Sequence, residues 1–145
     1  MTVGDLIRAR QEVFFVHPEN TVLDAACYLR DRQIRAAGVC NQQGSAVGII
    51  SQSDMAAKVV AENKCPAWVR VSEIMSADLS TVTPETPLEE CLQIMEGRGI
   101  FHLLILDAQL GFRGLISAKD LLKVIASDSK YRADMLESYV SPRWA

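Results

Sequence analysis

The segment GIISQSD occupies positions 48–54 and is followed at positions 114–120 by GLISAKD, a displacement of 66 residues. At the same displacement, residues 13–60 align with residues 79–126 without a gap, and ten of the aligned pairs are identical. Average residue usage would give roughly three identities in a window of this length. The chain therefore contains an internal duplication, and the duplicated pattern decides the fold class.

Each copy shows the same order of local signals. A short β-rich run that stops at a proline (residues 13–16 and 80–83) precedes a helix, which has apolar residues at positions i, i+3, i+4 and i+7. An apolar strand, a glycine turn and a second strand follow, and the pattern Ser-x-x-Asp then opens a second helix. In the second copy we expect Thr86 to cap the first helix, with Pro87 at the first helical position and Glu89 completing a capping box.

This order predicts a β-α-β-β-α arrangement in each half and an α+β fold class. Three strands and two helices are too few to bury a sufficient core alone, so the halves are expected to pack sheet to sheet as a pseudo-twofold pair. We expect repeat 1 at residues 1–63, a linker at 64–70, repeat 2 at 71–127 and a C-terminal helical tail at 128–145.

Composition excludes several classes of protein. The chain has 145 residues, of which 49% are hydrophobic and 23% charged, which is typical of a globular protein. A net charge of -3 argues against a nucleic-acid partner, and no apolar run is long enough to span a bilayer. The first fifteen residues contain an acid and no apolar core of a signal peptide, so we expect a cytoplasmic location and no membrane partner.

Motifs for catalysis or metal binding are not found in the sequence. The four cysteines form no C-x-x-C pair and the two histidines have no metal-finger spacing, so we expect reduced thiols and no metal. There is no P-loop, no G-x-G-x-x-G and no nucleophile elbow. We therefore expect no catalytic residues and no enzymatic activity.

The succession Val16-x-Pro18, a helix, Ile34-x-x-x-x-Val39, a glycine turn and then GIISQSD resembles the CBS domain, the cystathionine β-synthase repeat. Two copies in tandem resemble a CBS pair, or Bateman module, of the free-standing bacterial type. The resemblance implies a regulatory module that binds an adenosine-containing ligand (AMP, ADP, ATP, NAD or S-adenosylmethionine) in two clefts between the halves. It also implies a homodimer and, because no effector domain is recognised, a separate effector protein.

The resemblance assigns ligand contacts to particular positions. In one cleft Asp120 would accept hydrogen bonds from the ribose diol beside Ser117, and in the other Asp54 would do so beside Ser51. The adenine slots would be formed by Val13, Phe15, Ile105 and Ile116 in the Asp120 cleft, and by Leu79, Thr81, Val39 and Ile50 in the Asp54 cleft. The phosphate contacts would be Arg35 in the first repeat and His102 in the second, with Lys119 and Lys58 adding charge.

The chain also departs from the family pattern. Ser53 stands where relatives often carry Arg, and Phe101 replaces a common basic residue before the histidine. These changes remove phosphate-binding charge, more clearly from the Asp54 cleft. We therefore expect the two clefts to be inequivalent, with the Asp120 cleft the better site.

Structural roles remain open for the same residues. Each Ser-x-x-Asp is also an ordinary helix cap, His102 can be a satisfied strand residue, Arg35 can lie on the surface and Phe15 can belong to the core. The alternative function is a ligand-free protein-interaction or dimerisation module with no nucleotide binding.

Overall fold

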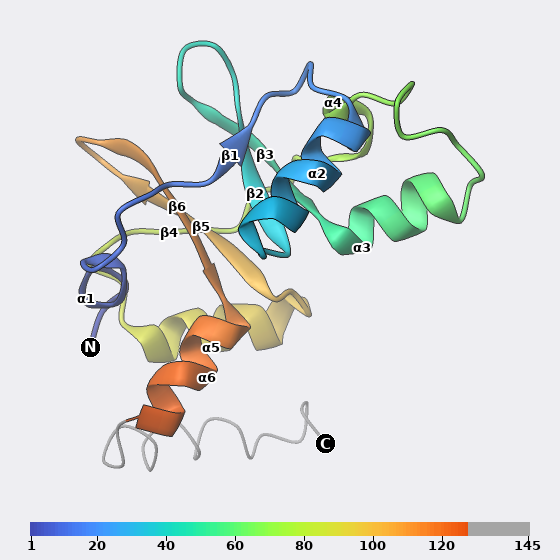
Figure 1. Ribbon diagram of the computed structural model, residues 1–145. Helices are drawn as coiled ribbons and strands as arrows, with labels where there is room; N and C mark the ends of the chain where they lie inside the picture. The colour runs from blue at the N-terminus through green and yellow to red at the C-terminus, as the bar shows by residue number, and fades with distance from the viewer. Residues whose placement is uncertain (128–145) are drawn as a thin grey trace.

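Two three-stranded sheets organise the computed structural model, which describes residues 1–127 (Figure 1). The first sheet has the order β1 (Phe15–Val16), β2 (Ala36–Cys40), β3 (Ala46–Ser51), and the second has the order β4 (Thr81–Val82), β5 (His102–Asp107), β6 (Gly111–Ser117). In each sheet the first pair of strands is parallel and the second pair antiparallel. Each antiparallel pair even shifts register at the same place, after Val39 and after Ile105, so the duplication extends to the backbone irregularities.

Helices complete each half in the expected order. The half-domains contain α2 (Val22–Arg32) and α5 (Leu88–Arg98) between the first two strands, and α3 (Gln52–Met55), η1 (Ala56–Val60) and α6 (Ala118–Ser127) after the last. Helix η1 is a single π-helical turn that continues α3. The predicted α+β class and the two β-α-β-β-α repeats are confirmed. The predicted tail at residues 128–145 lies outside the described residues.

The first helix of each repeat is capped differently. Helix α2 begins at a capping box in which Thr21 and Asp24 exchange hydrogen bonds with each other's backbone N–H groups. The capping box predicted for Thr86 and Glu89 is wrong. Pro87 has extended backbone (ψ 147°), so α5 starts only at Leu88, and the Thr86 hydroxyl instead accepts from the N–H of Thr83 at 3.0 Å.

Two short helices exchange places between the halves. Helix α1 (Val3–Ile7) precedes the first repeat in sequence, but Val3 and Ile7 are buried in the core of the second half. Helix α4 (Val71–Ile74) precedes the second repeat, but Val71 and Ile74 are buried in the core of the first half. Figure 1 shows α1 beside the second half and α4 next to α2. Each core is thus completed by the segment that leads into the other repeat.

The sheets also contact each other directly. A Cβ atom added to Gly38 on β2 would lie 2.3 Å from the ring of Phe112 on β6, so the aromatic ring fills the space above the glycine. Glycine permits an approach of sheet to side chain that any larger residue would prevent. Within residues 1–127 no helix is both long enough and apolar enough to cross a membrane.

Candidate functional site

A cavity of about 750 Å³ lies where the start of α6 faces the chain between α1 and β1. This volume is within the range of small-molecule sites in proteins. The walls come from four places, namely residues 10–14, residues 33–36 at the start of β2, the beginning of β5, and the end of β6 with the first turns of α6. The cavity therefore draws on both halves of the duplication.

The carboxylate of Asp120 lies in this cavity on the first turn of α6. Its Oδ2 atom accepts the N–H of Ser117 at 2.8 Å, and the Ser117 hydroxyl accepts the N–H of Asp120 at 3.1 Å. Because this reciprocal pair caps the helix, the structural role considered from the sequence is present. The same Oδ2 atom also accepts from Nη2 of Arg10 at 2.9 Å, a residue 110 positions away in the sequence.

His102 lines the same cavity from the first position of β5. Burial lowers the pKa of His102 below its ordinary value of 6.5; the charge of Asp120 opposes this shift and that of Arg35 adds to it. The imidazole is therefore mostly neutral at pH 7. A neutral ring with Arg35 nearby can donate or accept a hydrogen bond, and an arriving anion would favour its protonation.

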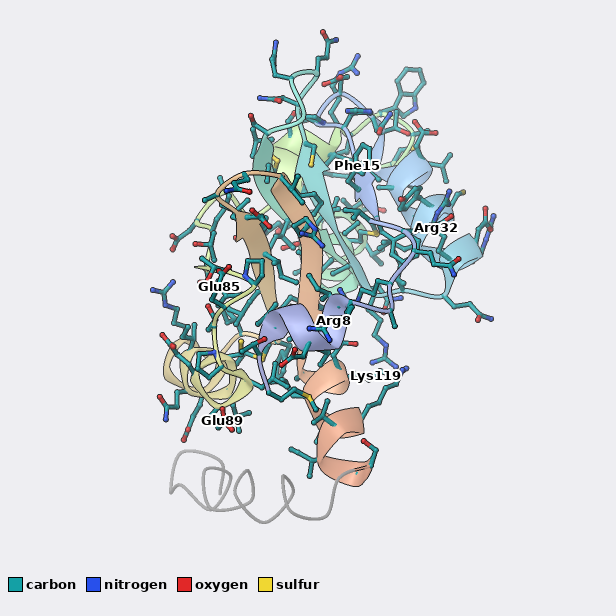
Figure 2. All side chains as sticks on the ribbon, turned by 90° about the vertical axis from the view of Figure 1, so that its left-hand side faces the viewer. Arg8, Phe15, Arg32, Glu85, Glu89 and Lys119 are labelled. Carbon is teal, nitrogen blue, oxygen red and sulfur yellow. The ribbon has the colours of Figure 1, made fainter. Side chains whose placement is uncertain are left out.

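Positive side chains outnumber negative ones around the cavity. Its charged lining residues are Arg10, Arg35, Lys119 and Lys123 against Glu12 and Asp120. Figure 2 labels Lys119 at the first turn of α6, where backbone N–H groups and the positive end of the helix dipole also favour an anion. The two repeats thus contribute charge to one site, since Arg35 from the first repeat and Lys119 from the second both line it.

The apolar part of the predicted site is only partly present. Val13 lines the cavity together with Phe14, which sequence analysis did not assign to it. The structure places the predicted Ile105 and Ile116 elsewhere, because both are fully buried in the core of the second half. Phe15 belongs to β1 and packs edge-to-face on His17 outside the cavity lining.

Around Asp54, the groups that the prediction assigns to a ligand have partners within the protein. Both carboxylate oxygens of Asp54 are occupied, one by the N–H and hydroxyl of Ser51 and the other by Lys58 at 3.1 Å. The side chain of Met75 covers Gly48, where an added Cβ would lie 2.6 Å from its sulfur atom.

The remaining residues predicted for the Asp54 cleft do not form an open slot. Val39 and Ile50 are fully buried in the core of the first half, whereas Leu79 is half-buried and Thr81 is exposed. Lys58 donates to the carbonyl of Ile74 as well as to Asp54, so its charge is already used. The surroundings of the two carboxylates therefore differ: Asp120 lines a cavity, whereas Asp54 is paired with Ser51 and Lys58.

Spacing between the lead-in helix and the first strand explains the difference. Twelve positions separate Val3 from Phe15, whereas ten separate Val71 from Thr81. The shorter connection lies against β3, where Ser76 and Ile49 exchange two backbone hydrogen bonds of 2.9 Å. At the equivalent place in the other half, the carbonyl of Leu115 accepts instead from the side chain of Arg10. The longer connection leaves room for the cavity.

Comparison with known proteins identifies the family. The family model described as "CBS domain" matches twice, at residues 3–61 and 71–127. The chain belongs to the CBS domain family. Its two copies form a CBS pair, as the resemblance of the sequence implied.

Relatives of this CBS pair come from bacteria, archaea and plants. A CBS domain-containing protein of Bacillus subtilis is 30% identical over 110 residues, which are 76% of each chain. An uncharacterised protein of Methanopyrus kandleri is 30% identical over 124 residues, 86% of this chain and 62% of that protein. The chain spans between 27% and 62% of the length of the first three curated relatives that it matches.

Solved CBS structures have the same architecture. A protein with CBS domains from Burkholderia ambifaria is 30% identical, has a TM-score of 0.82, and is matched over 88% of this chain and 96% of its own. A CBS domain protein from Pyrobaculum aerophilum, 14% identical with a TM-score of 0.80 over 94% of this chain and 99% of its own, was solved in complex with AMP. At 14% identity, this similarity shows only that the two proteins share a fold.

Sequence analysis missed Arg10, Lys123 and Glu12 in the wall of the CBS pair's cavity. Lys123 could have been found, because a residue three positions after Asp120 lies on the same face of a helix. Arg10 carries no such local signal, since only the tertiary fold brings residues 10 and 120 together. Within residues 1–127, no group of His, Cys, Asp and Glu is placed to hold a metal ion.

Proposed function

We propose that this CBS pair is a regulatory module that binds one adenosine-containing nucleotide per chain in the cavity at Asp120. The observation that carries the proposal is a helix-start carboxylate in a cavity of about 750 Å³ that has apolar residues and an excess of cations in its walls. This is the arrangement that a nucleotide needs, because its ribose, base and phosphate require different partners.

Each part of the nucleotide has a matching group. The carboxylate of Asp120, beside Ser117, is suited to accept the two hydroxyls of a ribose, since a charged acceptor makes stronger hydrogen bonds than a neutral one. Val13 and Phe14 offer an apolar surface for the base. Arg35, Lys119 and His102 surround the place left for phosphate.

Three solved structures with the same fold support an adenosine ligand. The Pyrobaculum aerophilum protein and a protein named CBSX2 were each solved with AMP. The CBS domain pair of a third protein was solved with methylthioadenosine and S-adenosylmethionine. These proteins are only 14%, 22% and 22% identical to this chain. The proposal of an adenosine-containing ligand therefore depends mainly on the residues that line this chain's own cavity.

One ligand per chain follows from the unequal clefts. Met75 covers Gly48, Ser76 is hydrogen-bonded to Ile49, and Asp54 is paired with Ser51 and Lys58, which supports a single ligand. Opening that cleft would require the loss of the two backbone hydrogen bonds between Ser76 and Ile49. We therefore assign the nucleotide to the Asp120 cavity alone.

Regulation then follows from the position of the cavity between the two halves. A ligand that binds one arrangement of the halves better than another shifts the population towards it.

We propose that this change is transmitted to a separate effector protein by a homodimer in the cytoplasm. The exposed Trp68 and Leu122 are apolar side chains available for contact between copies, and sedimentation equilibrium would test the dimer. The Burkholderia ambifaria protein, described as a candidate signal-transduction protein, fits a module that acts by binding rather than by catalysis.

Isothermal titration calorimetry on the full chain tests the proposal, with AMP, ATP, NAD and S-adenosylmethionine as ligands. We expect one bound nucleotide per chain and an affinity roughly 10- to 100-fold weaker in Asp120→Asn, because the hydrogen bonds to the charged acceptor are weakened. The matched variant Asp54→Asn removes the equivalent charge from the filled cleft and should bind as the wild type does.

Other outcomes are equally informative. A loss of binding in Asp54→Asn alone would assign the ligand to the other cleft. The absence of heat with all four ligands, from protein shown by circular dichroism to be folded, would contradict the nucleotide proposal. It would leave the ligand-free interaction module as the function.

A further inference from the structure

Arg10 is hydrogen-bonded to the carboxylate of Asp120, the group on which the proposed nucleotide site depends. Its Nη2 atom donates to Oδ2 of Asp120 at 2.9 Å and its Nη1 atom donates to the carbonyl of Leu115. The side chains of Arg10 and Asp120 are only 31% and 25% exposed, so this ion pair is partly shielded from water. A ribose that binds Asp120 must therefore displace a charge-assisted hydrogen bond.

The first repeat shows that the fold does not require this contact. The equivalent carboxylate, Asp54, pairs with Lys58 of its own helical segment at 3.1 Å. There the backbone N–H of Ser76 donates to the carbonyl of Ile49. In the other half the equivalent carbonyl, that of Leu115, accepts from the side chain of Arg10. The ion pair between Arg10 and Asp120 is thus a particular feature of the open cavity, not a consequence of the repeat.

The charges that remain indicate what would release Arg10. While Arg10 is paired with Asp120, the other charged lining residues are Arg35, Lys119 and Lys123 against Glu12. This excess of positive charge attracts an anion and disfavours a cation. A ligand with a phosphate brings a new anionic partner for the displaced guanidinium, whereas adenosine brings none.

We infer that Arg10 is a specificity-determining residue, which pairs with Asp120 until a ligand displaces it and so selects nucleosides that carry phosphate over uncharged or cationic ones. The inference rests on the proposed function and narrows its ligand class to nucleoside phosphates such as AMP. Adenosine must break the ion pair without compensation. S-adenosylmethionine must do so while adding a sulfonium cation to a positive cavity.

Calorimetric affinities for AMP and adenosine, measured on the full chain, test this selection. We expect Arg10→Ala to bind adenosine more tightly than the wild type does, and the ratio of AMP to adenosine affinity to fall about tenfold, since a hydrogen bond between charged groups contributes on this scale. Arg10→Gln, which keeps a donor for Leu115 but loses the charge, should show the same fall in the ratio.

The matched control is Arg8→Ala. Arg8 lies at the end of α1 (Figure 2), its side chain is 79% exposed, and it pairs with Asp5 rather than with a cavity residue. The control removes the same charge two positions away in the chain and should leave the ratio unchanged.

The outcomes separate this inference from the proposed function. If the wild type binds AMP and the ratio is unchanged in both Arg10 variants, Arg10 does not select and the inference fails, while the nucleotide site stands. Adenosine binding that is detectable only in the Arg10 variants would support the inference. Absence of binding of either ligand to the wild type and to the Arg10 variants would overturn both.

Discussion

Replacing Val3 by alanine tests whether the N-terminal helix belongs to the core of the second half. Residues this close to a chain end usually tolerate substitution, because most termini are loosely held. In this fold, however, Val3 is 0% exposed and packs with residues of α5, β5 and α6. A terminal side chain should therefore behave as a central one.

The size of the effect follows from the burial. Alanine removes two carbon atoms from a site without solvent contact, at about 0.8 kcal/mol each, and a cavity contribution is added to this loss. We expect the free energy of unfolding to fall by about 2–3 kcal/mol, which corresponds to a decrease in Tm of roughly 8 °C for a chain of this size.

Urea unfolding followed by circular dichroism measures the change, with an unaltered m-value as the sign that the native state is otherwise the same. The control is Val60→Ala, the same substitution at a side chain that is 76% exposed, for which we expect a change within about 0.5 kcal/mol. Amide hydrogen exchange adds a local measurement: in Val3→Ala, the amides of the second half should lose more protection than those of the first half. If Val3→Ala costs no more than Val60→Ala, the exchange of helices between the halves is refuted.

Two further predictions concern the contact between the sheets and the cavity. Gly38→Ala should destabilise the protein by about 1–3 kcal/mol, because its Cβ would lie 2.3 Å from the Phe112 ring. Adding Phe112→Leu to this variant should recover part of the lost stability. Purely additive losses of the two substitutions in urea unfolding would contradict this expectation. Because the pKa of His102 is lowered in the folded protein, the unfolded chain binds a proton at this residue more readily than the folded chain does. The free energy of unfolding should therefore decrease as the pH falls below about 6.5. His102→Gln should lose that part of the pH dependence between pH 7.5 and 5.5, and identical pH profiles for variant and wild type would show that His102 does not cause it.

Local patterns in the sequence were sufficient to predict the β-α-β-β-α order within each repeat, but not the short helices α1 and α4. Turn residues, apolar spacing and the Ser-x-x-Asp caps act over a few residues, and the duplication repeated each signal. The error at Thr86 was also local, because it depended on whether Pro87 stands inside or just before the helix. A proline is compatible with both positions, so only the backbone angles decide between them.

The position of Asp120 could be predicted, but parts of its surroundings could not. Side chains of a strand alternate between its two faces, so Leu115 and Ser117 line the cavity while Ile116 faces the core. This parity was available in the sequence and argues against a site role for Ile116. By the same reasoning Ile105, three positions after His102, is expected to face away from the cavity.

Contacts between distant segments carry no comparable pattern. The helices α1 and α4 have similar sequences, and nothing in either shows which half will receive it. The pairing of Arg10 with Asp120 depends on that exchange, because α1 fixes the start of the segment that carries Arg10. The contribution of Arg10 to the charge of the cavity therefore became visible only in three dimensions.

The reciprocal insertion of α1 and α4 separates the unit of duplication from the unit of folding. A boundary drawn between residues 63 and 71 follows the gene repeat, but it cuts off one short helix from each hydrophobic interior. Fragments divided there would be complementary pieces that need reassembly, not autonomous modules that could be recombined. Natural or engineered shuffling of this architecture has to move both repeats together.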